Sequence, residues 1–144
     1  LAAAEDFYRK SLAIKEKVAT ETLDVARTLN NLGIVQFPGK DYAAAEVSYR
    51  RALEITQKLA PGTVDVARMF SNLGSLAKER GDAATAEGFY WQALALGEKI
   101  APGSISPVAN VMTNLGDLAR DRADLRGHIL QQLLQKRNSP NTSF

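Results

Sequence analysis

The sequence predicts an all-α solenoid built from repeated pairs of antiparallel helices, and three recurring phrases lead to this prediction. Asn-Leu-Gly begins at positions 31, 72 and 114, in steps of 41 and 42 residues. Ala-Glu-x-x-Tyr begins at positions 4, 45 and 86, and Val-Ala begins at positions 25, 66 and 108. Self-similarity at a fixed period of roughly 20–50 residues is typical of solenoids, in which each unit buries its apolar face against its neighbours.

Residues 63–100 show the pattern of one unit most clearly. Apolar residues recur at the i, i+3, i+4, i+7 spacing of an amphipathic helix, at Val66, Ala67, Phe70, Leu73, Gly74 and Ala77. Thr63 is a candidate N-cap of this helix, and Gly81 tolerates the left-handed conformation that ends it. Asp82 then caps a second helix. Each unit is therefore predicted to consist of a helix, a tight turn, a second helix and a short segment of helix-breaking residues.

In this register, the chain begins on the second helix of a unit. The expected helices lie near 2–19, 22–36, 41–59, 64–80, 83–100 and 106–121. Pro107 suits the first position of its helix. Pro38 should stop the 22–36 helix early and make residues 37–40 irregular. Because Leu1 already stands inside the pattern, we expect the chain to be part of a longer protein.

The repeated small residues predict close helix contacts. Gly inside a helix costs roughly 1 kcal/mol relative to Ala, so its recurrence at one register indicates a steric need. The glycines are Gly33, Gly74 and Gly116. Tyr8, Tyr49 and Tyr90 are expected to fill the space between successive units.

The pattern weakens after residue 121. His128, Gln132 and Gln135 stand where Ala, Tyr and Ala are expected, although leucines and Ile129 still form an apolar stripe. We interpret 122–137 as a divergent capping helix with a polar outer face. A truncated, spliced or frame-shifted end is the alternative. Residues 138–144 are expected to be a disordered tail.

The array resembles the tetratricopeptide repeat over about residues 1–121. Leu73-Gly74, Ala86, Tyr90 and Ala93 match the family's core signature, and so do the equivalent residues of the preceding unit. The period of 41–42 residues resembles the longer subtype found in kinesin light chains. The resemblance implies a right-handed superhelical solenoid that has no catalytic role and binds other proteins.

The composition supports the interpretation that the protein has no catalytic site. The 144 residues include no cysteine and one histidine, His128, so a zinc site of the usual ligands is excluded. The net charge of +2 comes from nearly balanced charges and gives no reason to expect nucleic-acid binding. No apolar run approaches the ~18 residues of a membrane span. We expect no catalytic residue, no metal and no cofactor.

The candidate binding site lies along the first helices, which line the concave surface in tetratricopeptide arrays. An Asn side chain both donates and accepts hydrogen bonds, so it suits the backbone of an extended peptide, and Arg suits carboxylates. The resemblance to kinesin light chains implies short acidic or aromatic-acidic peptides as partners. The candidate peptide-binding residues are Arg27, Asn31, Arg68, Asn72 and Asn114. Alternatively, the asparagines only join neighbouring helices by hydrogen bonds.

Phe89 and Trp91 flank the inward-facing Tyr90 and should point partly outward. They are candidates for a contact on the convex surface with another domain or subunit, or they are ordinary surface residues.

We therefore predict a cytoplasmic module that binds a peptide or a partner domain in its concave groove. One alternative is a structural or oligomerisation module, with possible self-association or a groove filled by its own tail. Another is a regulatory arm of a larger signalling enzyme.

Overall fold

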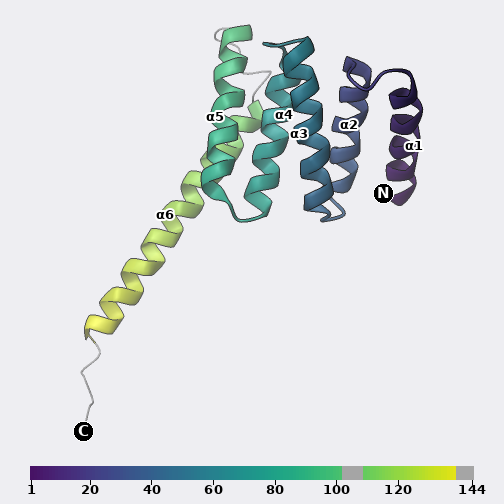
Figure 1. Cartoon of the computed structure of the whole chain (residues 1–144). Helices are drawn as coiled ribbons and strands as arrows, with labels where there is room; N and C mark the ends of the chain where they lie inside the picture. The colour runs from purple at the N-terminus through teal and green to yellow at the C-terminus, as the bar shows by residue number, and fades with distance from the viewer. Residues whose placement is uncertain (102–108, 139–144) are drawn as a thin grey trace.

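Six α-helices make up the described part of the chain, which comprises residues 1–101 and 109–138 of a computed structural model. Side chains are not described at 109, 125–130 and 132–138. The helices are α1 (Ala2–Val18), α2 (Leu23–Gln36), α3 (Tyr42–Leu59), α4 (Val64–Glu79), α5 (Ala83–Ile100) and α6 (Ala109–Asn138). Figure 1 shows α1 to α5 standing side by side as a row of antiparallel helices. The predicted all-α solenoid is confirmed.

The helices form two layers. Hydrogen bonds join the first helices of successive units, from α4 to α2 and from α6 to α4. The second helices α1, α3 and α5 form the other layer. Within it, Arg51 of α3 forms an ion pair with Glu16 of α1, and the guanidinium of Arg50 lies 5.9 Å from the ring centre of Phe89 on α5.

The turns follow the predicted local chemistry. At the end of α4, Gly81 adopts a φ of 80°, and the Asp82 amide donates to the carbonyl of Ala77 over 2.9 Å. This closes the helix with the bond pattern typical of a left-handed C-terminal residue. Asp82 in turn accepts a hydrogen bond from the amide of Thr85, which caps α5. Thr63 stands at the N-cap of α4, but its hydroxyl donates to Ala60 instead of capping.

The effect of Pro38 is also as predicted. Helix α2 ends at Gln36, and residues 37–40 form a turn that ends at Lys40 with a φ of 61°. Pro107 lies outside the described residues.

Two of the repeated glycines are required by the packing. A Cβ added at Gly33 would lie 2.6 Å from a ring carbon of Tyr49, and one added at Gly74 would lie 2.6 Å from a ring carbon of Tyr90. Both tyrosines are buried, so their rings have little room to move. Each ring packs against the glycine of its own unit. Tyr49 and Tyr90 therefore join the two helices of one unit, whereas the sequence suggested a role between units.

The glutamate of each Ala-Glu-x-x-Tyr motif links one unit to the next. Its carboxylate binds a side chain at the end of α2, just beyond α4, or at the equivalent register within α6. The pairs are Gln36 with Glu5, Arg80 with Glu46 and Arg122 with Glu87. Sequence reasoning missed these contacts, although the threefold recurrence of the glutamate was a visible signal.

The C-terminal end differs from the expected arrangement. Instead of a helix near 106–121 followed by a separate helix at 122–137, one helix, α6, runs continuously from Ala109 to Asn138. Lys40 and Gly81 turn the chain after α2 and α4, but Ala123 stands at the same register in α6. Ala is the strongest helix former, so the helix continues. A capping role for 122–137 stays a prediction.

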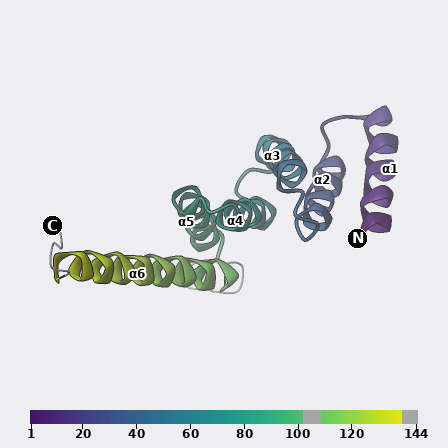
Figure 2. The ribbon, with the colours of Figure 1, turned by 90° about the horizontal axis from the view of Figure 1, so that it is seen from below.

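Helix α6 also differs in direction. In Figure 2, α2 to α5 are seen nearly end-on, whereas α6 is seen along its length. In Figure 1, α6 extends beyond the ends of the other helices. Its later part therefore leaves the row of helices.

Candidate functional site

The predicted binding residues lie on the outer face of the first-helix layer. Arg27 and Arg68 are exposed, and Asn31, Asn72 and Asn114 are partly exposed. They occupy equivalent turns of α2, α4 and α6 because the repeat keeps these helices in register.

Three of these residues surround one hollow of about 180 Å³ between the N-terminal halves of α2 and α4. Arg27 and Asn31 approach it from α2, and Arg68 approaches it from α4. The remaining lining residues are Leu23, Asn30, Thr56, Ala60, Thr63, Asp65 and Met69. The structure thus brings Arg27, Asn31 and Arg68 together, although 41 residues separate the two arginines in the sequence.

The two arginines differ in how free they are to bind a ligand. The guanidinium of Arg68 forms an ion pair with Asp65 one turn away, over 2.7 Å. Arg27 has no hydrogen-bond or ion-pair partner in the described part of the chain. A carboxylate entering the hollow would meet Arg27 without competition, whereas it would compete with Asp65 for Arg68.

Asn72 already has a structural contact. Its amide nitrogen donates to Oδ1 of Asn30 over 3.0 Å, which links α4 to α2. In the next unit, the amide of Asn110 donates to the hydroxyl of Ser71 over 3.2 Å. A side-chain amide has further donor and acceptor sites, so Asn72 can hold Asn30 and still face a ligand. Asn114 lies on α6 and does not line the hollow.

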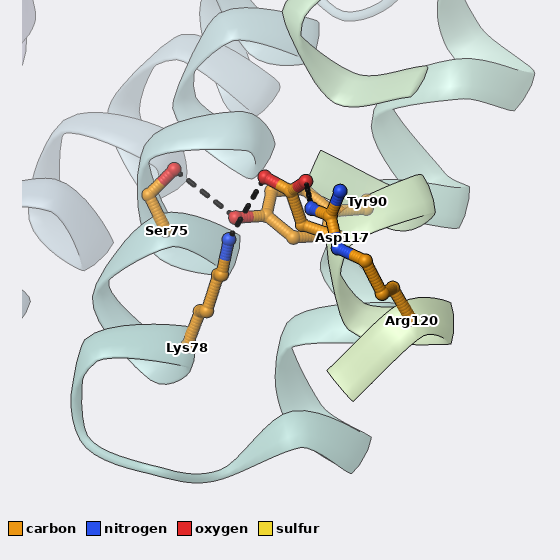
Figure 3. Close-up of polar contacts among 5 residues, drawn as sticks. All are labelled: Ser75, Lys78, Tyr90, Asp117 and Arg120. Carbon is orange, nitrogen blue, oxygen red and sulfur yellow. Dashed lines mark hydrogen bonds and ion pairs between the residues drawn. The ribbon is translucent and has the colours of Figure 1, made fainter. Parts of the chain in front are cut away.

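Beyond Asn72, the charged part of this face lies between α4 and α6. Lys78 approaches a carboxylate oxygen of Asp117 at 3.4 Å, and Arg120 binds the other oxygen. Figure 3 shows these three side chains beside the hydroxyl of Tyr90, which donates to Ser75 over 3.2 Å. Burial raises the pKa of the Tyr90 phenol. Both cations here are already paired with Asp117, whereas Arg27 at the hollow has no such partner among the described residues.

Phe89 and Trp91 have different environments. The ring of Phe89 stacks on Phe70 with 6.3 Å between ring centres, and Arg50 lies over it. Trp91 is 55% exposed. Trp91 thus has more than half of its surface free for a contact, whereas the Phe89 ring already packs against Phe70 and Arg50.

A second hollow, of about 380 Å³, lies beside Phe89 between α3, α4 and α5. Its main charged group is Glu46, whose carboxylate binds Arg50 at 2.8 Å and also binds Arg80. The hydrogen bond from Arg50 is the largest cause of a lowered pKa at Glu46. The cations here are already paired with this carboxylate, so we favour the hollow at Arg27 as the binding site.

Comparison with known proteins identifies the family. The sequence profile of the tetratricopeptide repeat matches residues 1–58 and 24–99. The chain belongs to the tetratricopeptide repeat family. Such repeats generally mediate protein–protein interactions, and the family is typically non-catalytic. A comparison with curated proteins finds no match.

Among solved structures, this tetratricopeptide repeat chain is similar to the crystal structure of BtubC (BKLC) from P. vanneervenii. The sequences are 25% identical, and the TM-score is 0.77. The match covers 97% of this chain but only 57% of BtubC, so this chain spans little more than half the length of that protein. The similarity supports a kinesin light chain-like fold, as predicted. No helix in the described part of the chain has the length and apolar character that a membrane crossing requires.

Proposed function

We propose that this tetratricopeptide array binds a short acidic segment of a partner protein along the outer face of α2 and α4. Arg27, Asn31 and Arg68 are its anchors. The observation that carries the proposal is the shared hollow that these three side chains line. An unpaired guanidinium at the rim of a hollow is a ready site for a carboxylate, because the pair forms two parallel hydrogen bonds.

The polar and apolar residues that line the hollow support a peptide as the ligand. Asn31 offers an amide that both donates and accepts, which is what a peptide backbone needs. The buried Met69 and the exposed Leu23 add apolar surface for an aromatic or aliphatic side chain. The proposed partner is therefore an acidic peptide with an adjacent apolar residue. A cytoplasmic location stays a prediction.

Fluorescence polarisation of labelled acidic-aromatic peptides tests the proposal. We expect saturable binding that weakens with added salt, because the contact is electrostatic. The Arg27→Ala/Arg68→Ala variant should lose about 1–3 kcal/mol of binding free energy. Peptides with lysine in place of the acidic residues should not bind.

A matched control removes two positive charges elsewhere. Lys17→Ala/Lys99→Ala lowers the net charge by the same amount at exposed positions on α1 and α5. Equal loss of affinity in both double variants would show that net charge alone attracts the peptide. Unchanged affinity in the arginine variant would reject the proposed site.

A further inference from the structure

The hollow between α2 and α4 has a buried side-chain amide in its lining. Asn30 lines the hollow and is 5% exposed. Its Oδ1 accepts from the amide of Asn72, but its own amide nitrogen, Nδ2, has no partner in the described part of the chain. This nitrogen is not closed off from solvent either. Asn30 therefore offers unused N–H donors to the hollow that it lines.

The same hollow lies at the N-terminal end of α4, where Ala60, Thr63 and Asp65 line it. The first amides of a helix have no partner within the helix, and the side chain of the N-cap residue often accepts from one of them. Thr63 occupies the N-cap position of α4, but its hydroxyl donates to the carbonyl of Ala60 over 3.0 Å. The first amides of α4 thus stay available to an anion.

The charges around the hollow favour an anion of more than one negative charge. The charged residues that line it are Arg27, Arg68 and Asp65. Arg68 and Asp65 offset each other in their 2.7 Å ion pair, which leaves the charge of Arg27. The N-terminus of a helix adds the equivalent of roughly +0.5, so the hollow offers about +1.5. A phosphate monoester carries about −1.5 to −2 near pH 7, whereas a carboxylate carries one negative charge.

The donors also come from different directions. Arg27 and Asn30 approach from α2, and the free amides belong to α4. A phosphate monoester has three acceptor oxygens around a tetrahedral phosphorus, whereas a carboxylate has two oxygens in one plane. A phosphate can therefore accept from all three groups through separate oxygens. The lining hydroxyls of Thr56 and Thr63 donate to backbone carbonyls, which leaves Asn30 as the buried side-chain donor of the hollow.

We propose that the group bound in this hollow is the phosphate of a phosphorylated serine or threonine in the partner peptide. Asn30 and the first amides of α4 bind it at the base of the hollow, and Arg27 binds it at the rim. The inference rests on the proposed peptide-binding function and narrows its ligand class. Because an unmodified serine brings no charge to these donors, phosphorylation of the partner controls binding.

Three pools of short fluorescent peptides test the inference. The pools share degenerate flanking positions and differ at one fixed position, which is phosphoserine, glutamate or serine. Fluorescence polarisation should show binding of the phosphoserine pool that is at least about tenfold tighter than that of the glutamate pool, because phosphate gains a further charge-assisted hydrogen bond. The serine pool should not bind. Unlabelled phosphopeptides should displace the label at lower concentration than inorganic phosphate does.

Asn30→Ala tests the contact with the buried amide. We expect the affinity for the phosphoserine pool to fall about fivefold to tenfold, with a smaller change for the glutamate pool, because Arg27 can bind either anion. The preference for phosphoserine should therefore nearly disappear. A purely structural role of Asn30 would weaken both pools equally and keep their ratio.

Asn110→Ala is the matched control. It removes the hydrogen bond from Asn110 to Ser71, which also joins two first helices, and Asn110 does not line the hollow. Both the affinities and their ratio should stay unchanged. Circular dichroism of each variant verifies that the helices are retained.

The outcomes separate this inference from the proposed function. Equal affinity for the phosphoserine and glutamate pools would reject the phosphate and leave the acidic-peptide site in place. No binding by any pool would reject both. Inorganic phosphate that displaces the label as effectively as phosphopeptides do would show a site for the free anion instead of a peptide. An unchanged preference for phosphoserine in the folded Asn30→Ala variant would overturn the assigned contact.

Discussion

The side-chain amide of Asn72 donates a hydrogen bond of 3.0 Å to Oδ1 of Asn30, and this contact joins two helices that lie 42 residues apart in sequence. Asn30 is buried. If the amide of Asn72 were removed, water could not easily replace it as the hydrogen-bond donor to the Asn30 side-chain carbonyl. In the Asn30-Asn31 pair, Asn30 thus serves the array and Asn31 is partly exposed, whereas both side chains of the Ser71-Asn72 pair bond to a neighbouring first helix.

We predict that Asn72→Ala lowers the free energy of unfolding by about 1–2 kcal/mol, because it leaves a buried acceptor unpaired. Urea unfolding measures the loss. A double-mutant cycle with Asn30→Ala should give a coupling energy of at least about 0.5 kcal/mol. Asn31→Ala is the control and should leave stability nearly unchanged. Additive losses at Asn30 and Asn72 would contradict the predicted coupling.

Gly74→Ala and Gly116→Ala should have opposite effects on stability. At Gly74 the new methyl group would meet the buried Tyr90 ring, and overpacking of this kind costs about 1–3 kcal/mol. At Gly116 the space is open, so the better helix propensity of Ala should add up to about 1 kcal/mol. Thermal unfolding compares the two variants. Equal effects would argue against the packing role of Gly74.

Stability should fall at high pH because of the buried phenols. Burial raises the pKa of Tyr49 to about 12, above the value of about 10 expected in the unfolded chain. Since the folded pKa is the higher one, the stabilisation is complete below about pH 10 and is lost as the pH rises toward 12. For Tyr49 the loss over this range is at most about 1.4 kcal/mol per pH unit.

Tyr49→Phe should remove the part of the high-pH decrease in unfolding free energy that comes from ionisation of Tyr49. Urea unfolding at pH 8 and pH 11 should show a smaller difference in the variant than in the original chain. An identical difference would mean that Tyr49 ionises equally in the folded and unfolded states. Because the pKa of Tyr90 is also raised, some dependence should persist in the variant.

Asp65→Asn should strengthen binding of an acidic peptide. The change releases Arg68 from its 2.7 Å ion pair and removes a carboxylate that repels the ligand. We expect roughly a threefold to tenfold gain in affinity at low salt, smaller at high salt. Fluorescence polarisation measures it, and Asp24→Asn on α2, which pairs with Lys15 instead, is the control. Weaker binding would indicate that Asp65 itself contacts the peptide.

Alanine substitutions at Phe89 and Trp91 should differ in their effect on the free energy of unfolding. Phe89→Ala removes the ring that stacks on Phe70 and should cost about 1–3 kcal/mol of unfolding free energy. Trp91→Ala should cost less than about 1 kcal/mol, because that side chain is mostly exposed. Chemical unfolding compares the two variants. A large loss at Trp91 would show that it packs more tightly than its exposure suggests.

The sequence by itself determined the repeat, and it determined the helix pairs and turns as far as α5, but not the continuous α6. Local chemistry sufficed for these, since Gly81 ends a helix, Asp82 starts one and Pro38 prevents one from continuing. The glycine at position 74 also signalled a close approach, because Gly in a helix interior needs a compensating reason.

Only the tertiary structure decided which side chains meet. Whether Arg68 is free or paired, and whether Asn72 binds a ligand or Asn30, depends on side-chain distances that a repeat pattern does not contain. The same holds at Gly116, which is identical in sequence to Gly33 and Gly74 but has no ring against it. The glycine permits a close approach, but only the folded chain shows whether a ring meets it, as Tyr49 and Tyr90 do at Gly33 and Gly74.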